Sequence, residues 1–219
     1  EVFIHASLYL GGRSRADESQ HVIVAFRVNN HDEYAADRSD RDESILIVRV
    51  ILVVDSEKTG FAREELRRFL DTFLYREAAF LVDEIVSVDV AAHALEARLD
   101  TTRVLPFARE QRVDLLHPAH VSAGEILMAT GSLGCLQAWL FHGIRWDEGW
   151  SGFGNRIHRA DFKSLARIGP PLELHAHETQ WRDGPRRVVM RCEFRFVQED
   201  RLVYAGDQSA MFFKDRDLA

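Results

Sequence analysis

The chain has 219 residues, 46% of them hydrophobic, and a formal net charge of −7. This length and apolar content allow one large core or two smaller ones. Charges of both signs are spread along the sequence without a basic run, which argues against a nucleic-acid partner. No apolar run reaches the roughly 18 residues of a membrane span, so we expect a cytoplasmic protein without a membrane partner.

The two cysteines, Cys135 and Cys192, lie in apolar segments, and neither belongs to a CxxC pair. We expect two buried, reduced thiols. The sequence begins with Glu1, so we also expect a processed product or a piece of a longer protein.

The first 60 residues are predicted to form three strands. Residues 1–10 and 22–28 alternate between two faces, and residues 44–55 are almost continuously apolar, as in a strand that is buried on both faces. The polar, charged stretch at 29–44 is predicted to be a surface loop.

The remaining residues, 61–219, are predicted to form a second unit. Its most informative element is a helix over 122–142 that mixes small and large apolar residues. Gly131 and Gly134 inside it cost roughly 1 kcal/mol each relative to alanine. We therefore expect another element to approach this helix closely, as a sheet would around a central helix. The other predicted elements are a helix over 61–73 and strands over 78–90, within 94–115, and over 158–166, 172–181, 188–196 and 202–214.

Four sequence motifs occur in an order typical of one superfamily. They are Phe80–Ile85, His117-Pro118 followed by Ala123-Gly124, Asp161-Phe162-Lys163 with 168–172, and Val203-Tyr204-Ala205 with Met211-Phe212. Residues 75–213 thus resemble the hotdog superfamily, and within it the beta-hydroxyacyl-acyl-carrier-protein dehydratases. The resemblance implies an α+β fold with an antiparallel sheet wrapped around the helix 122–142. It also implies a homodimer or an internal pseudo-dimer.

Residues 1–60 resemble the last three strands of a hotdog unit. They are interpreted as an incomplete or divergent N-terminal half of a double hotdog, or as an extension of the main sheet.

The start of the central helix departs from the dehydratase pattern. Dehydratases pair a histidine there with an acidic residue inside the helix, and that acidic position aligns with Ala129. The acidic residue of this helix is Glu125. The arrangement of His120 and Glu125 resembles instead that of hotdog thioesterases, which often carry a carboxylate in the first turn of this helix. Either resemblance implies an acyl substrate carried on coenzyme A or on the phosphopantetheine of an acyl carrier protein, in fatty-acid or polyketide metabolism, with no further cofactor.

Both reactions need hydrogen-bond donors for the thioester oxygen, and the N-terminus of the central helix suits that role. Dehydration also needs a base and an acid, whereas hydrolysis needs a group that activates water or attacks directly. The predicted catalytic residues are His117, His120 and Glu125. The predicted substrate-binding residues are Ser122, Gly124, Trp139, Asn155 and Arg156.

Dehydration of a 3-hydroxyacyl thioester is our first hypothesis, thioester hydrolysis the second, and a non-catalytic acyl-binding or partner hotdog subunit the third. Structural alternatives accompany the predicted residues. Ser122 and Glu125 have the spacing of a helix capping box, and Trp139 is also typical of a core or dimer contact. His175 and His177 share a strand face but lack a third ligand at suitable spacing, so no metal site is predicted.

Overall fold

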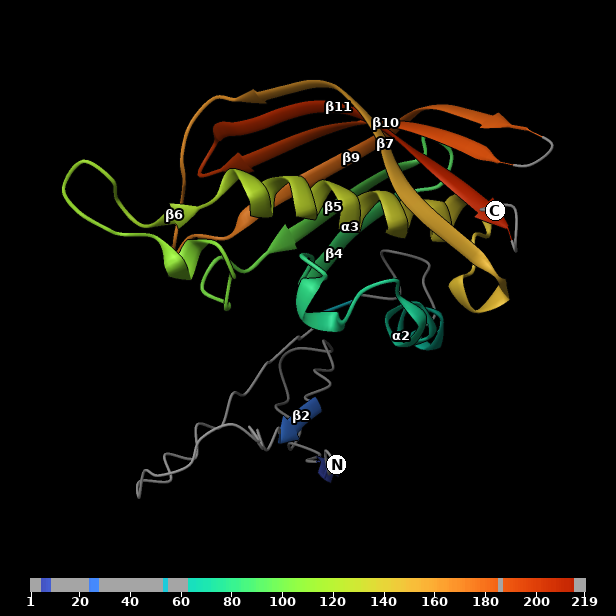
Figure 1. Ribbon diagram of the computed structural model, residues 1–219, viewed down its shortest axis with the longest axis horizontal. Helices are drawn as coiled ribbons and strands as arrows, with labels where there is room; N and C mark the ends of the chain where they lie inside the picture. The colour runs from blue at the N-terminus through green and yellow to red at the C-terminus, as the bar shows by residue number, and fades with distance from the viewer. Residues whose placement is uncertain (1–4, 9–23, 28–52, 55–62, 185–186, 215–219) are drawn as a thin grey trace, which may run out of the picture. The chain divides into compact units, whose positions relative to one another are not determined.

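A computed structural model describes residues 5–8, 24–27, 53–54, 63–184 and 187–214 (Figure 1). The chain divides into two units, Glu1–Ile51 and Leu52–Ala219. In the first unit, β1 (His5–Leu8) pairs with β2 (Val24–Arg27) in antiparallel fashion, and both lie within predicted strands. The predicted loop at 29–44 and most of the predicted strand at 44–55 lie outside the described residues.

The second unit is built on one large sheet. Its strands are, in spatial order, β3 (Val53–Val54), β4 (Glu84–Asp89), β5 (Ala94–Leu99), β9 (Leu172–Asp183), β10 (Val188–Gln198), β11 (Arg201–Lys214) and β7 (Trp150–Phe162). β3 is parallel to β4, and every other neighbouring pair is antiparallel. A separate short pair joins β6 (His120–Val121) to β8 (Ala166–Arg167).

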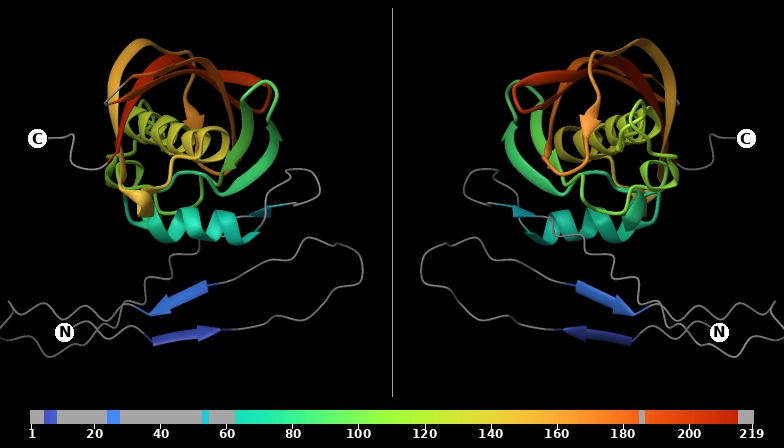
Figure 2. Two further views of the ribbon diagram at one scale, coloured as in Figure 1. Left: turned by 90° about the vertical axis from the view of Figure 1, so that its right-hand side faces the viewer. Right: turned by 90° about the vertical axis from the view of Figure 1, so that its left-hand side faces the viewer.

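The sheet curls around α3 (Ala123–His142), which the end-on views of Figure 2 show directly. Leu133, Leu136 and Trp139 on this helix have no exposed surface. The predicted central helix is therefore confirmed, and the second unit has the hotdog fold. Within the described residues, no helix combines the length and the apolar character that crossing a membrane would require.

A second helix, α2 (Arg63–Thr72), lies on the side of α3 that the sheet leaves open (Figure 2). Phe69 of α2 is fully buried and meets Trp139 edge to face, with 5.3 Å between ring centroids. Burying one such aromatic side chain contributes about 1.5–3 kcal/mol. The predicted helix at 61–73 is confirmed over its described part.

Strand periodicity predicted the C-terminal part of the sheet correctly. Along β10 every second side chain from Val188 to Phe196 is buried, whereas those between them are more exposed. This alternation places one face of the strand against the core, as a period of two predicts.

Two apolar stretches predicted as strands fold differently. Residues 77–79 form the short 3₁₀ helix η1 (Glu77–Ala79), and β4 begins only at Glu84. Phe80, Leu81 and Val82 are buried without strand pairing, and the Leu81 amide donates to Ser132 Oγ at 3.1 Å. Their apolar character therefore reflects packing beneath α3. Beyond β5, residues 100–115 form turns and the 3₁₀ helix η2 (Ala108–Glu110).

The glycine-rich segment after α3 forms a strand over most of its length. The 3₁₀ helix η3 (Trp146–Glu148) is followed at once by β7, which starts at Trp150. Gly152 lies so close to β11 that an added Cβ would stand 2.9 Å from the ring of Phe212. Glycine allows this close pairing at the edge of the sheet.

Candidate functional site

The N-terminus of α3 is closed by the predicted capping box, which is confirmed. Ser122 Oγ accepts a hydrogen bond from the Glu125 amide at 3.3 Å, and Glu125 Oε2 accepts one from the Ser122 amide at 2.8 Å. Two helix-terminal donors are thereby satisfied. Gly124 stands against Phe107, whose ring would be 3.3 Å from an added Cβ.

The carboxylate of Glu125 also anchors the start of η2. Its Oε1 accepts hydrogen bonds from the amides of Phe107 at 2.8 Å and Ala108 at 2.9 Å. The residue is only 1% exposed, and three backbone amides occupy its two oxygens. This arrangement favours the structural role of Glu125, and its predicted catalytic role remains a prediction.

The two predicted catalytic histidines lie together just before α3. Their rings meet edge to face with centroids 5.0 Å apart. Nδ1 of His117 lies 3.0 Å from the Arg112 carbonyl, and Nδ1 of His120 lies 2.8 Å from the Pro118 carbonyl. Since a carbonyl only accepts, each Nδ1 carries the proton, which leaves Nε2 as the basic nitrogen. Neither histidine lines the large cavity between α3 and the strands β7, β10 and β11.

A cavity of about 410 Å³ opens between α3 and the strands β7, β10 and β11. Its lining is mainly apolar and includes Leu127, Gly131, Gly134, Met190, Phe194 and Phe212. An added Cβ at Gly131 would meet nothing within 4 Å, and one at Gly134 would meet only Met190 Cε at 3.8 Å. The predicted close approach to these glycines is therefore wrong. The small residues of α3 leave room for a cavity instead.

Two predicted substrate-binding residues, Asn155 and Arg156, line this cavity. Asn155 Nδ2 donates to Ser209 Oγ at 3.3 Å, and His158 Nε2 lies 3.2 Å from the same oxygen. Ser209 also lines the cavity and is 8% exposed. Ser209 and His158 were not predicted from the sequence, because only the pairing of β7 with β11 brings them together.

A second polar group in the cavity wall comes from α3 and β11. Thr130 Oγ1 donates to Gln208 Oε1 at 3.1 Å, and Gln208 Nε2 donates to the Tyr204 hydroxyl at 2.8 Å. Thr130 and Gln208 therefore add two neutral polar groups to the mainly apolar wall.

The cysteines in the cavity wall do not act as nucleophiles. Both are free, and burial raises the pKa of Cys135 to about 12. Burial also raises the pKa of Cys192, with contributions from the charges of Glu178 and Asp207. A thiol is nucleophilic only as the thiolate, so neither cysteine is active near neutral pH.

Trp139 was predicted as a substrate-binding residue, but its surroundings are those of a core residue. It has no exposed surface, and its Nε1 donates to Glu65 Oε1 of α2 at 2.8 Å. The guanidinium of Arg145 lies over its ring, 4.2 Å from the centroid. Trp139 does not line the cavity.

No protein-family model and no curated protein sequence matches this chain. Among similar solved structures, a thioesterase from Haemophilus influenzae is 16% identical, with coverage of 72% of this chain and 94% of the other, and a TM-score of 0.47. A mutant thioesterase from Pseudomonas aeruginosa is 14% identical, with coverage of 71% and 96% and a TM-score of 0.48. A hypothetical thioesterase from Streptococcus pneumoniae, solved with coenzyme A, is 10% identical, with coverage of 61% and 87% and a TM-score of 0.42.

Proposed function

We propose that this protein hydrolyses acyl thioesters and that the acyl chain lies in the cavity between α3 and β7, β10 and β11. The cavity itself supports the proposal most strongly. Its volume of about 410 Å³ is within the range of about 300–1,000 Å³ that small-molecule sites occupy. An apolar wall with a few polar groups suits an acyl chain that ends in a polar thioester.

Ser209 and Asn155 in the wall, with His158 beside Ser209 but outside the lining, supply the chemistry that hydrolysis needs. His158 Nε2, 3.2 Å from Ser209 Oγ, is in reach to accept a proton either from this hydroxyl or from a water held beside it. The oxygen so activated attacks the thioester carbonyl carbon, and the carbonyl oxygen gains negative charge, which the Asn155 amide is placed to stabilise. Collapse of this intermediate expels the thiol, which takes the proton from His158. If Ser209 was the attacking group, water then releases the acyl group by the same steps.

Arg156 is the charged residue in the cavity lining, and we propose that it contacts a phosphate of the carrier. Coenzyme A and phosphopantetheine both present such a phosphate, so either donor is compatible with this residue. Comparing acyl-coenzyme A with acyl-carrier-protein substrates would distinguish the two donors.

Dehydration, the first hypothesis from the sequence, has less support from the site. It requires an acid and a base near the substrate carbons. The position where dehydratases carry their helix acid is Ala129, which is fully buried. None of the described residues that line the cavity is an aspartate, a glutamate or a histidine. Hydrolysis needs only one base, and His158 can provide it through its contact with Ser209, which lines the cavity.

We also propose that two copies of the chain associate. β7 is an edge strand of the large sheet, and Phe153, Ile157 and Phe162 on it are each about half exposed. An unpaired edge with apolar side chains favours pairing with another chain. The alternative, an internal pseudo-dimer with residues 1–60, involves residues most of which lie outside the described part. Light scattering of the purified chain would show whether it is a dimer.

Mass spectrometry of the products tests the proposed reaction. The protein would be incubated with 3-hydroxyacyl, 2-enoyl and saturated acyl thioesters of coenzyme A. Release of free acid and thiol is the expected result. Loss or gain of one water with the thioester intact would establish a dehydratase or hydratase instead. No conversion by the folded protein would favour a non-catalytic acyl-binding subunit.

Variants then locate the site. We expect His158→Gln to lower kcat by about 100-fold, the lower end of a general base's contribution. His117→Ala and His120→Ala test the site predicted from the sequence at the start of α3. A loss of that size in these two variants, with His158→Gln unaffected, would move the catalytic site to the start of the helix.

A further inference from the structure

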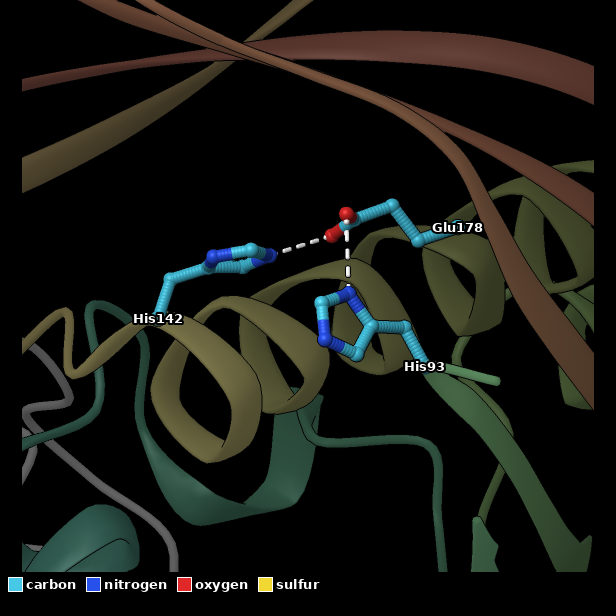
Figure 3. Close-up of side chains that lie close together, drawn as sticks. All are labelled: His93, His142 and Glu178. Atoms are coloured by element: carbon cyan, nitrogen blue, oxygen red, sulfur yellow. Dashed lines mark hydrogen bonds and ion pairs between the residues drawn. The ribbon is translucent and has the colours of Figure 1, made fainter. Parts of the chain in front are cut away.

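Three potential ligands meet at the end of α3 opposite the capping box. His93 lies in the turn between β4 and β5, His142 is the last residue of α3, and Glu178 is in β9 (Figure 3). Glu178 Oε1 lies 3.1 Å from His93 Nδ1, and Glu178 Oε2 lies 2.5 Å from His142 Nε2. Within the described part of the chain, this is the one group of three or more His, Cys, Asp or Glu residues whose ligand atoms all lie within 4.8 Å of one another.

The backbone of His93 is constrained to direct its ring at Glu178. Its φ of +48° is in the left-handed region, which a non-glycine residue rarely adopts. The His93 carbonyl accepts hydrogen bonds from the Glu178 amide at 3.1 Å and from Gln137 Nε2 at 3.2 Å. A strained conformation persists only where its surroundings enforce it, and such positions cluster at functional sites.

Aromatic side chains fix the planes of both imidazoles. His142 stacks on Trp181 with centroids 3.5 Å apart, and His93 stacks on Phe141 at 5.0 Å. The Glu178 side chain is 6% exposed and that of His142 is 11% exposed, whereas that of His93 is 37% exposed. The cluster is therefore rigid on its inner side and open to solvent at His93.

We infer that His93, His142 and Glu178 bind a divalent transition-metal ion, with Zn²⁺ as the probe, which ties the end of α3 to β9 and to the β4–β5 turn. Two imidazole nitrogens and one carboxylate oxygen are a ligand set that zinc accepts, with water in the fourth position. Each imidazole must present a lone pair where it now donates a proton to Glu178. That proton moves to the other ring nitrogen, or to water if the imidazole was charged.

The inference does not rest on thioester hydrolysis, since none of the three residues lines the acyl cavity. The site is also distinct from the histidine pair of β9 considered in the sequence analysis. His175 Nδ1 lies 3.5 Å from Glu96 Oε1. Among the described residues, His175 and Glu96 belong to no group of three potential metal ligands. His175 therefore provides a matched control on the same strand as Glu178.

The test uses the full chain without an affinity tag. The protein is stripped with a chelator, dialysed, and titrated with Zn²⁺ by calorimetry, and bound zinc is counted by plasma mass spectrometry. We expect one tightly bound zinc per chain and a thermal unfolding midpoint that rises with zinc concentration. Absence of stoichiometric zinc in the folded wild-type protein would overturn the inference.

Two variants assign the ligands. His93→Asn keeps a residue that tolerates the left-handed conformation, and Glu178→Gln keeps the size of the side chain. We expect each to weaken zinc binding by more than about 10-fold, the least that losing a supporting contact costs a metal site. His175→Asn should bind zinc as the wild-type protein does. If both folded variants kept wild-type affinity, or if His175→Asn lost it, these three residues would not be the ligands.

Discussion

The two ends of α3 each bury a carboxylate, and they satisfy it in different ways. At the N-terminal end Glu125 accepts hydrogen bonds from three backbone amides. At the C-terminal end Glu178 accepts from two imidazoles. A buried carboxylate requires donors in either case, because leaving it unpaired is costly. Backbone amides can only donate, so Glu125 is suited to structure. Imidazoles can also become ligands, so Glu178 is suited to binding.

The imidazoles also set the charge of Glu178. Burial raises the pKa of this carboxyl, but the hydrogen bonds from His142 and His93, together with their charge interactions, outweigh burial and bring the pKa below its usual range. Glu178 is therefore ionised at neutral pH, as a metal ligand must be.

The largest expected effect comes from removing the carboxylate at the N-terminal end. Glu125→Ala leaves three backbone amides, two of them at the start of η2, without their acceptor. Each unsatisfied buried donor costs about 1–3 kcal/mol, so we expect a loss of at least about 3 kcal/mol in the free energy of unfolding, measured in urea. Ser122→Ala is the control and should cost about 1 kcal/mol, the usual value for a helix cap. A loss below that of Ser122→Ala would show that Glu125 is not the anchor.

The corresponding change at the C-terminal end should cost less. In metal-free protein, Glu178→Gln keeps one acceptor oxygen, and a neutral histidine can turn its lone pair toward the new amide. We expect a loss of about 1.5–3 kcal/mol, the range for hydrogen bonds with a charged partner. Glu173→Gln, at an exposed position of the same strand, is the control and should change the free energy of unfolding little. A loss as large as that of Glu125→Ala would remove the contrast between the two ends.

The middle of α3 should become more stable on substitution. Gly131 has open space where a Cβ would stand, so alanine fits without moving a neighbour. We expect Gly131→Ala to raise the free energy of unfolding by about 0.5–1 kcal/mol, because alanine favours the helix. A lower free energy of unfolding, measured by thermal or urea denaturation, would mean that the wall of the cavity closes around this position.

A third carboxylate, Asp207, provides a partly buried ion pair for comparison, with the smallest expected effect. Asp207 accepts hydrogen bonds from Arg191 Nε at 2.7 Å and Nη2 at 2.5 Å, and the pKa of Asp207 is lowered mainly by them. A lowered pKa means that the stabilisation is complete above the unfolded pKa of about 3.9 and is lost as pH falls through the folded value. Asp207→Asn should therefore be less stable than wild type at pH 7, and this difference should shrink at about pH 3. An equal difference at both pH values would contradict the ion pair.

Local patterns in the sequence predicted the parts of the structure that depend on local spacing. The capping box of Ser122 and Glu125, the central helix and the alternation along β10 all follow from residues a few positions apart. Phe80–Val82 were wrongly predicted to lie in a strand, because their apolar character reflects burial without strand pairing.

The candidate sites were predicted only in part because they depend on strand register. Asn155 and Arg156 were named from the sequence, but their neighbour Ser209 is more than 50 residues away and meets them through the pairing of β7 with β11. His93, His142 and Glu178 are separated by 49 and 36 positions, and only the curl of the sheet around α3 brings them together. Spacing rules for metal ligands do not detect such a set.

The most direct test of thioester hydrolysis in this cavity is the dependence of thiol release on acyl-chain length in Gly134→Leu and Gly134→Ala. Alanine fits at this position, since its Cβ would lie 3.8 Å from Met190 Cε, whereas leucine extends into the cavity. We predict that Gly134→Ala keeps the wild-type dependence on chain length. Gly134→Leu should lower kcat/KM for long acyl chains by at least about 10-fold and leave kcat/KM for short chains unchanged. A loss of about 10-fold is roughly what one to two methylene groups contribute in an apolar pocket. An unchanged profile in folded Gly134→Leu, or equal loss for all chain lengths, would contradict the placement of the acyl chain in this cavity.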